Sequence, residues 1–351
     1  MVIGALAYPW LVPFKPLLPW LIFFMLFFTF CKIDPLDLRL HRWHWVVLAV
    51  QMLLSFLTYA TVFYLSHDNI LAQGLMLCFI MPTATAAPII AGKLGGSIQN
   101  LTTFTLLSNF ATTLVVPAVF PLMNDNLQLS TFELLSTLNP QLSTFLSAFL
   151  LLLSRISPLL LGPFFSAWLL RLGVNAYYRR HDNQSSIDNN RQSIVNRQSS
   201  NRQFTLSPSW AQAPFYLWVT SITILTATVT ETVISNFQSQ ITNMIILIIG
   251  SFFACLFQFG VGKLIGYRLP APSKGRDYQD VLINPAAAPK TMAGVSSITA
   301  GQAFGQKNTS LGVWMAQTYL DPLSSLGAAA YIIWQNLFNS AQLALAARKK
   351  A

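Results

Sequence analysis

Charged residues are scarce in this chain. Only 9% of its 351 residues are Asp, Glu, Lys or Arg, whereas a typical globular protein carries about 25%. So few charges cannot cover a soluble core of this size, and 54% of the residues are hydrophobic. The composition therefore excludes an ordinary soluble enzyme. It predicts a polytopic membrane protein whose main partner is the lipid bilayer.

Motifs of enzymes and metal sites are missing as well. The sequence has no HExxH, no GxSxG, no paired acids suited to catalysis and no cluster of histidines. Cys31, Cys78 and Cys255 lie far apart in apolar runs, without the CxxC spacing of a metal or redox site. We therefore expect three buried free thiols, no metal, no cofactor and no enzymatic activity.

Acidic residues are the rarer kind of charge. The chain has 21 Lys and Arg against 11 Asp and Glu, which gives a net charge of +10. In a soluble protein this balance would favour nucleic-acid binding, but in a membrane protein it usually reflects basic cytoplasmic loops. We therefore expect no nucleic-acid partner.

Apolar segments follow one another through the whole chain. A helix needs about 20 mostly apolar residues to cross the bilayer. A short first segment, Val2–Val12, ends at a turn formed by residues 13–16, and nine longer segments follow. These nine are Leu17–Ile33, Trp43–Leu65, Ile70–Ala91, Ile98–Leu122, Leu142–Leu170, Pro214–Ile234, Ile241–Tyr267, Met292–Tyr319 and Leu323–Ala346.

Basic residues occupy every second loop between these segments. The even-numbered loops and the C-terminus carry nearly all Lys and Arg, and the third, fifth, seventh and ninth loops carry none. Lys15, in the first loop, is the exception. Because basic loops stay in the cytoplasm, we expect about ten crossings with both termini cytoplasmic, in a multi-pass protein of the bacterial inner membrane.

A low-complexity segment interrupts this pattern. From His181 to Gln203 the sequence repeats Asn-Arg-Gln-Ser imperfectly, which is typical of a disordered cytoplasmic linker. We therefore divide the chain into residues 1–178, with the first five spans and the first span of a second repeat, a linker at residues 179–208, and residues 209–351 with the last four spans. Two five-span repeats are inverted relative to each other, as in many secondary transporters.

Two of the predicted spans are interrupted at matching places in the two repeats. Residues 79–88 read FIMPTATAAP, with Pro82 and Pro88 as structural breaks, although a merely kinked helix is an alternative there. Residues 300–312 read AGQAFGQKNTSLG, with Gly301 and Gly305 as structural breaks. Paired interruptions favour a transporter binding site, and the N-terminus of each second half-helix carries a partial positive charge.

Cations lie deep inside two of these spans. Lys307 falls near the centre of Met292–Tyr319, where a lysine costs about 2.5–3.5 kcal/mol, so its default interpretation is functional; snorkelling to the surface is the alternative. Arg155 lies within Leu142–Leu170 and suits either a structural role or ligand contact. Glu231, the only acid inside a span, lies near a span end. Two cations deep in the spans and no acid at a span centre favour an anionic substrate.

The interrupted segments resemble those of the bile acid:sodium symporter family, including its bacterial members. The family's first motif is similar to Pro-Gly-Gly-Thr-Ala-Ser-Asn, where residues 82–88 read PTATAAP, followed by Gly96 and by residues 102–108, TTFTLLS. Its second motif is similar to Glu-Val-Gly-Met-Gln-Asn-Ser-Gly-Leu, where residues 303–311 read AFGQKNTSL, followed by Pro322 and by residues 331–336, YIIWQN. The resemblance implies an all-α fold of about ten transmembrane helices in two inverted five-helix repeats, with crossed discontinuous fourth and ninth helices.

The residues that bind sodium in the family are mostly replaced in this chain. The family's Ser-Asn pair corresponds to residues 87–88, Ala-Pro, its Glu to Ala303 and its Gln to Lys307, and only the hydroxyl of Thr105 remains. A one-residue slip would instead bring two glutamines to the last two places, Gln302 and Gln306. Hard cations need oxygen ligands, and an ammonium repels sodium. The resemblance therefore implies that Lys307 takes the electrostatic role of the bound sodium, and it could also exchange a proton during transport.

We therefore expect a secondary active transporter of a small organic anion that works by alternating access. The alternatives are a non-transporting membrane receptor or sensor for a small anion, and an arsenite-permease-like efflux carrier. The latter group resembles Pro-Cys at the first crossing, where Thr83 follows Pro82 here. The predicted substrate- or ion-binding residues are Thr83, Thr85, Thr105, Ser108, Arg155, Gln302, Gln306, Lys307, Asn308 and Thr309. The substrate, the direction of transport, the coupling ion and the oligomeric state stay open.

Overall fold

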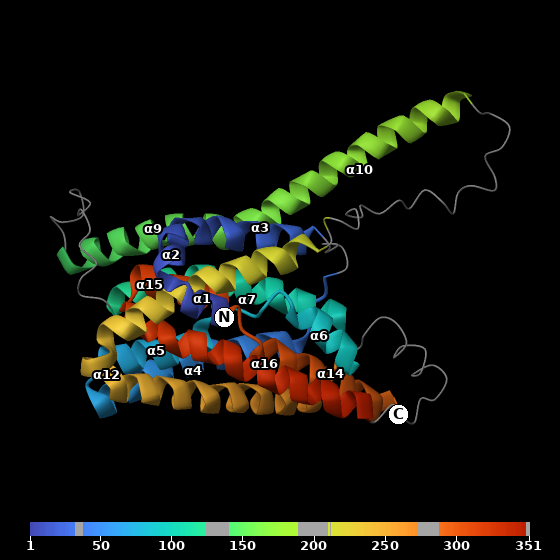
Figure 1. Ribbon diagram of the computed structural model, residues 1–351. Coiled ribbons are helices and arrows are strands. Elements are labelled where there is room, and N and C mark those ends of the chain that lie inside the picture. Colours follow the sequence, from blue (N-terminus) through green and yellow to red (C-terminus); the bar gives the residue numbers. More distant parts are fainter. Residues whose placement is uncertain (32–37, 124–139, 189–209, 211, 272–287, 349–351) are drawn as a thin grey trace.

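The computed structural model describes residues 1–31, 38–123, 140–188, 210, 212–271 and 288–348 (Figure 1). Every regular element in these residues is a helix, and the only β-type pairing among them is an isolated bridge between Thr83 and Lys307. In chain order the elements are α1 (Val2–Leu6), α2 (Tyr8–Leu11), the 3-10 helix η1 (Val12–Leu17), α3 (Leu18–Phe30), α4 (Arg42–Ser66), α5 (Asn69–Ile80), α6 (Ala87–Leu94), α7 (Ile98–Val119), η3 (Phe120–Leu122), α9 (Pro140–Leu160), α10 (Gly162–Asp188), α12 (Ala213–Arg268), α14 (Ala288–Gly305), α15 (Thr309–Tyr319), η5 (Pro322–Ser324) and α16 (Ser325–Arg348).

Several of these helices are long and apolar enough to cross a membrane. Four helical runs in the described residues meet this criterion: Tyr8–Phe30, Arg42–Ser66, Ile98–Leu122 and Ala213–Arg268. A bent pair, Thr144–Leu160 with Gly162–Tyr177, makes a fifth if it is one span. The predicted class, an all-α membrane protein, is thereby confirmed.

The N-terminal helices differ from the predicted short first span. Val2–Val12 is not one unit, because α1 ends at Leu6 and a second helical run continues from Tyr8 to Phe30. The predicted turn at residues 13–16 is part of η1. Proline fits this element because its fixed φ suits the early positions of a helix, where its missing N–H has no partner to lose.

The helix α12 is too long to be one straight rod across a bilayer. Its backbone leaves the helical region at Gln240, with φ −128° and ψ 21°. Figure 1 shows the yellow half before this residue and the orange half after it folding back on each other. The two predicted segments Pro214–Ile234 and Ile241–Tyr267 thus lie on either side of the kink.

The predicted span Leu142–Leu170 is divided. α9 ends at Leu160, α10 begins at Gly162, and the two helices meet at an angle of 42°. α10 then runs to Asp188 and projects from the body (Figure 1), so the predicted disordered linker is helical over residues 181–188. No proline or glycine follows Gly173 in α10, so no strong helix breaker interrupts it there. The part of the linker at residues 189–208 lies outside the described residues.

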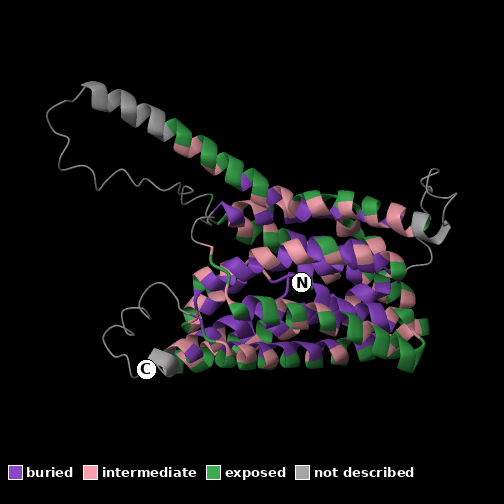
Figure 2. Ribbon diagram, turned by 180° about the vertical axis from the view of Figure 1, so that it is seen from behind, coloured by how far each residue is buried: buried purple, intermediate pink, exposed green. Residues whose placement is uncertain are grey.

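Small residues let the helices of the body approach closely. A Cβ added at Gly266 of α12 would lie 2.1 Å from the Ser296 oxygen of α14, and one at Gly327 of α16 would lie 2.4 Å from the Gly74 oxygen of α5. Such contacts are typical of helix packing in membranes. Figure 2 shows buried residues gathered on the inward sides of these helices, whereas α10 is mostly exposed or intermediate where its burial is described.

Candidate functional site at the helix crossing

Pro82 produces the first break by ending α5. A proline has no N–H for the carbonyl four residues earlier, and its ring crowds that carbonyl. The Cys78 oxygen therefore loses its helical partner, and Gln258 Nε2 of α12 donates to it instead at 3.0 Å. The chain becomes helical again at Ala87, and Pro88 occupies one of the first two positions of α6. Pro88 thus begins a helix and, contrary to the prediction, does not break one.

The second break lies between Gly305 and Thr309. α14 continues through Gly301, so the prediction of a break at this glycine is wrong. A Cβ at Gly301 would lie 2.6 Å from Lys263 Cγ, so its small size serves packing against α12. Gly305 ends α14 and abuts the ring of Phe259, where an added Cβ would lie 2.4 Å from the ring. The helix stops there because the next residues pair with the first break.

The two breaks meet in a short antiparallel bridge. Ala84 N donates to Gln306 O at 3.1 Å, and Asn308 N donates to Pro82 O at 2.7 Å. Thr83 and Lys307 are the paired residues of this bridge. The prediction that the interrupted segments face each other is confirmed, and the alternative of a merely kinked helix is excluded for the first segment.

The bridge residues cap each other's helices in a reciprocal way. Thr83 Oγ1 donates to Ala303 O at 2.7 Å, and Lys307 Nζ donates to Phe79 O at 3.1 Å. Each acceptor lies four residues before the opposite bridge residue, in the last turn of a helix whose final carbonyls have no intrahelical partner. The side chains of Thr83 and Lys307 therefore hold the C-terminal ends of α14 and α5.

The backbone N–H groups of the bridge residues repeat the same symmetry. Thr83 N donates to Ser108 Oγ of α7 at 3.1 Å. Lys307 N donates to Gln335 Oε1 of α16 at 2.9 Å. In each case the acceptor comes from the long helix that follows the broken segment in the sequence. The two halves of the site are thus built on one local plan.

Lys307 is a buried lysine without an acidic partner among the described residues. Its side chain is 1% exposed, which excludes snorkelling to the surface. Nζ has the single hydrogen bond to Phe79 O and lies 5.0 Å from the centre of the Phe304 ring. The C-terminus of a helix carries a partial negative charge, which favours a cation there. The end of α5 therefore supplies the stabilisation that a carboxylate would otherwise give.

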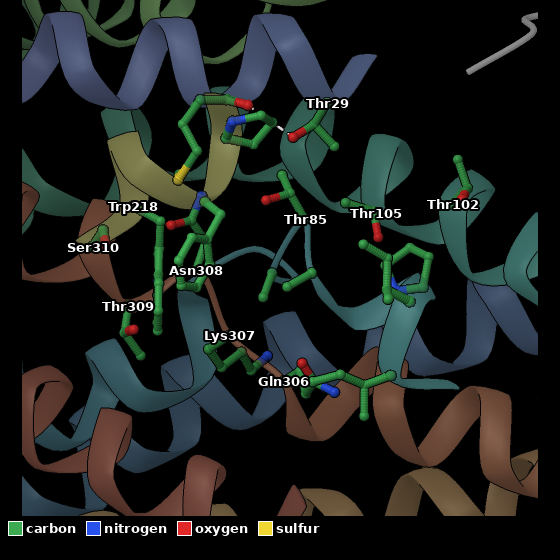
Figure 3. Close-up of a pocket in the computed structure, with 18 of the residues that line it drawn as sticks. Thr29, Thr85, Thr102, Thr105, Trp218, Gln306, Lys307, Asn308, Thr309 and Ser310 are labelled. Atoms are coloured by element: carbon green, nitrogen blue, oxygen red, sulfur yellow. Dashed lines mark hydrogen bonds between the residues drawn. The ribbon is translucent and has the colours of Figure 1, made fainter. Parts of the chain in front are cut away.

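A cavity of about 460 Å³ lies beside the bridge, and Lys307 is among the residues that line it. It is lined by the C-terminal end of α3 and by the N-terminal ends of α7 and α12 (Figure 3). Residues of both breaks and of α16 complete the wall. The N-termini of α6 and α15 both reach it, through Pro88 and Ile89 and through Thr309 and Ser310. Two helix ends with partial positive charge thus face one space, and such ends bind anions.

Asn308 lines this cavity and carries an unpartnered donor. Its Oδ1 accepts from Leu311 N at 3.3 Å and so caps α15. This bond leaves Nδ2 as the other arm of the amide, and Nδ2 is buried without a hydrogen-bond partner. The residue is only 5% exposed and lines the cavity. A buried donor of this kind calls for an acceptor, because leaving it unpaired costs about 1–3 kcal/mol.

The predicted site residues fall into three groups. Those that line the cavity are Thr85, Pro88, Thr105, Gln306, Lys307, Asn308 and Thr309 (Figure 3). Those that are buried around the bridge without lining the cavity are Pro82, Thr83, Ser108 and Gln302. Arg155 belongs to neither group, because its side chain is on an exposed face of α9, and Glu231 is exposed on α12. Contact of Arg155 with the ligand is therefore not supported, since helix rotation turns the residue away from the cavity.

Sequence reasoning missed several polar residues of the site. Gln51 Nε2 of α4 donates to Met81 O at 2.9 Å, and Tyr331 Oη of α16 donates to Gly305 O at 2.8 Å. Gln258 and Gln335 act similarly, as described above. A glutamine inside an apolar span is a usable signal, because an amide there needs a partner. Trp218 and Thr29, which line the cavity, have no such signal in the sequence.

A comparison with models of known protein families gives no match, and a comparison with curated proteins gives no significant match.

Proposed function

We propose that this protein is a secondary transporter that moves a small organic anion across the membrane by alternating access. The observation that carries the proposal is the cavity beside the crossing, which is lined by two helix N-termini and by Asn308, whose Nδ2 has no hydrogen-bond partner. These groups are donors with partial positive charge, so their natural ligand is an anionic group such as a carboxylate or a sulfonate.

The remaining walls of the cavity describe the rest of the ligand. Met25 and Phe30 of α3 and Phe215 and Trp218 of α12 bring apolar and aromatic surface to it. A volume of about 460 Å³ is within the range of pockets that hold small organic molecules. The proposed substrate is therefore an amphipathic anion, with its charged group at the helix N-termini and its apolar body against α3 and α12.

Lys307 has a separate role in this proposal. Its ammonium lies at the C-terminal end of α5, whereas the ligand lies at the N-terminal ends of α6 and α15. The ammonium is then at a helix end of partial negative charge, and the anion is at helix ends of partial positive charge. In the bile acid:sodium symporter family, which the chain resembles, this cation is sodium. Here Lys307 takes the role of that ion, so transport does not depend on sodium.

The proposal includes ten spans in two inverted repeats. The support for it is the reciprocal set of bonds from Thr83 and Lys307, together with the kink of α12 at Gln240. The alternation of basic and non-basic loops supports cytoplasmic termini and a position in the bacterial inner membrane. An arsenite carrier receives no such support, because none of the residues that line the cavity is a cysteine.

A thermal-shift screen tests the function. The detergent-solubilised protein is heated with a panel of carboxylates and sulfonates that differ in their apolar body, once in sodium chloride and once in choline chloride. We expect amphipathic anions to raise the unfolding temperature equally in both salts, since a ligand stabilises the state that binds it. Uptake of a stabilising anion into proteoliposomes then separates a transporter from a receptor. A tenfold or larger effect of sodium on affinity would refute the role given to Lys307.

Reporter fusions test the orientation. A reporter that is active only in the cytoplasm should work after Ala351, and the same reporter inserted at Asn126 should behave as external, because the basic loops fix the topology. The reverse pattern would contradict the assignment.

A further inference from the structure

Lys15 is the one basic residue that departs from the alternation of basic loops, and the structure gives it specific partners. Its Nζ lies 3.3 Å from Gln317 O and 3.4 Å from Gln317 Oε1. The neighbouring Phe14 and Leu17 are 49% and 47% exposed, whereas the Lys15 side chain is half-buried. The lysine is thus turned inward from an otherwise exposed 3-10 helix.

Gln317 connects this lysine to a third element. Its Nε2 lies 3.1 Å from Thr232 Oγ1 of α12, and it also donates to Pro322 O at 3.2 Å and Ser325 Oγ at 2.9 Å. Gln317 is only 9% exposed. It lies near the C-terminal end of α15, where the ammonium of Lys15 meets a partial negative charge. η1, α12 and α15 are therefore joined at one polar cluster: Lys15, Thr232 and Gln317.

This cluster lies at the opposite end of the same three helices from the cavity. The cavity touches α3 at Met25 and Phe30, α12 at Trp218, and α15 at its first residues. Going along each helix away from the cavity leads to Lys15 just before α3, to Thr232 in α12 and to Gln317 in α15. Ile98 and Phe215, which line the cavity, are 55% and 59% exposed, so the cavity reaches the surface at the end away from this cluster.

We infer that Lys15, Gln317 and Thr232 form a latch that closes the end of the pathway opposite to the cavity mouth. The inference rests on the proposed function, because a transporter that alternates must separate α3 and α12 from α15 at this end to expose the cavity there. Lys15 and Thr232 belong to one side of the separation and Gln317 to the other. Opening breaks the bonds of Lys15 and Thr232 to Gln317 and no covalent bond.

Thiol labelling of a cavity residue tests the latch without any ligand. The reporter is Thr85→Cys, and the probe is a membrane-impermeant sulfonated methanethiosulfonate added to either face of sealed vesicles. The native Cys31, Cys78 and Cys255 are at most 2% exposed, so the chain without the reporter gives the background. We expect slow labelling from the face on which Lys15 lies and fast labelling from the other.

Removing the latch should change only the rate at which Thr85→Cys is labelled from the face on which Lys15 lies. We expect Lys15→Met to raise labelling from the Lys15 face about tenfold, because losing a charge-assisted bond shifts the population towards the open form. Thr232→Val, a milder change, should raise it about threefold. Lys15→Arg keeps the donors, and Lys93→Met removes an exposed lysine elsewhere, so both should leave the rate unchanged.

The outcomes separate the latch from the proposed function. Equal labelling rates in Lys15→Met, Thr232→Val and the parent would overturn the latch, even if organic anions stabilise the protein. Faster labelling in both variants would support the latch, even if no anion stabilises the protein and the assignment of an anion transporter fails.

Discussion

The two breaks that meet at the crossing are built on one plan, but they differ in what stops the helix and in what caps it. The first contains Pro82, and α6 begins without a side-chain cap. The second contains no proline, and Asn308 caps α15. At the equivalent bridge positions the first break places a neutral hydroxyl, Thr83, and the second places the ammonium of Lys307. The second break therefore carries the charge and the free donor, and the first supplies the scaffold.

Asn308→Asp should have the largest effect, because it acts on the free donor of the second break. Aspartate keeps the acceptor that caps α15, so the fold should be retained. It replaces the unpartnered Nδ2 by a carboxylate oxygen that repels an anion, so we expect affinity for a stabilising anion to fall at least a hundredfold. A thermal-shift titration measures the affinity. The control is Asn336→Asp, which places the same charge at an exposed residue of the cavity wall. Unchanged affinity in Asn308→Asp would place the anion elsewhere.

Lys307→Met tests the charged side of the comparison. Methionine keeps the length and removes the charge, so anion affinity should fall at least tenfold, since the positive charge beside the cavity is lost. The ligand-free protein should unfold at no lower temperature. Removing an ion buried without a carboxylate relieves several kcal/mol of desolvation, which exceeds the roughly 1–3 kcal/mol cost of leaving Phe79 O unpaired. A large fall in stability with unchanged affinity would mean that Lys307 is only a structural cap.

Thr83→Val is the matched variant in the first break. Valine has nearly the shape of threonine but cannot donate to Ala303 O, which is left buried and unpaired. We expect a loss of about 1–3 kcal/mol in stability, seen as a lower midpoint in thermal unfolding, and less than a threefold change in anion affinity. A stronger effect on affinity than that of Lys307→Met would reverse the division of roles between the two breaks.

Pro82→Ala should have the smallest effect. Alanine would permit a continuous helix, but the extended conformation is also held by the bridge bonds of Ala84 N and Pro82 O. Gln258 occupies the Cys78 oxygen that a continued helix would use. We expect a change in stability below about 1 kcal/mol. Loss of anion binding in this variant would indicate that proline alone maintains the first break.

Local chemistry determined much of what the sequence could predict. The low charge content and the apolar runs gave the membrane class, because the hydrophobic effect acts on composition and length. Pro82 marked the first break, because a missing N–H and a steric clash act on the residue's own helix. Lys307 stood out because a cation in an apolar span needs a special partner.

Tertiary contacts decided the rest. The sequence marked Gly305 as a break, and α14 ends there. The course of residues 306–308 after it is held by tertiary contacts, because their carbonyls and N–H groups pair with a segment far away in the sequence. The orientation of α9 placed Arg155 on an exposed face. The partner of Lys307 is the C-terminal end of α5, and no sequence pattern predicts that this end lies beside the lysine. The sequence by itself determined which backbone and side-chain groups need partners, because that need is local. Only the tertiary structure decided which groups satisfy them, because those groups come from helices that meet only when the chain is folded.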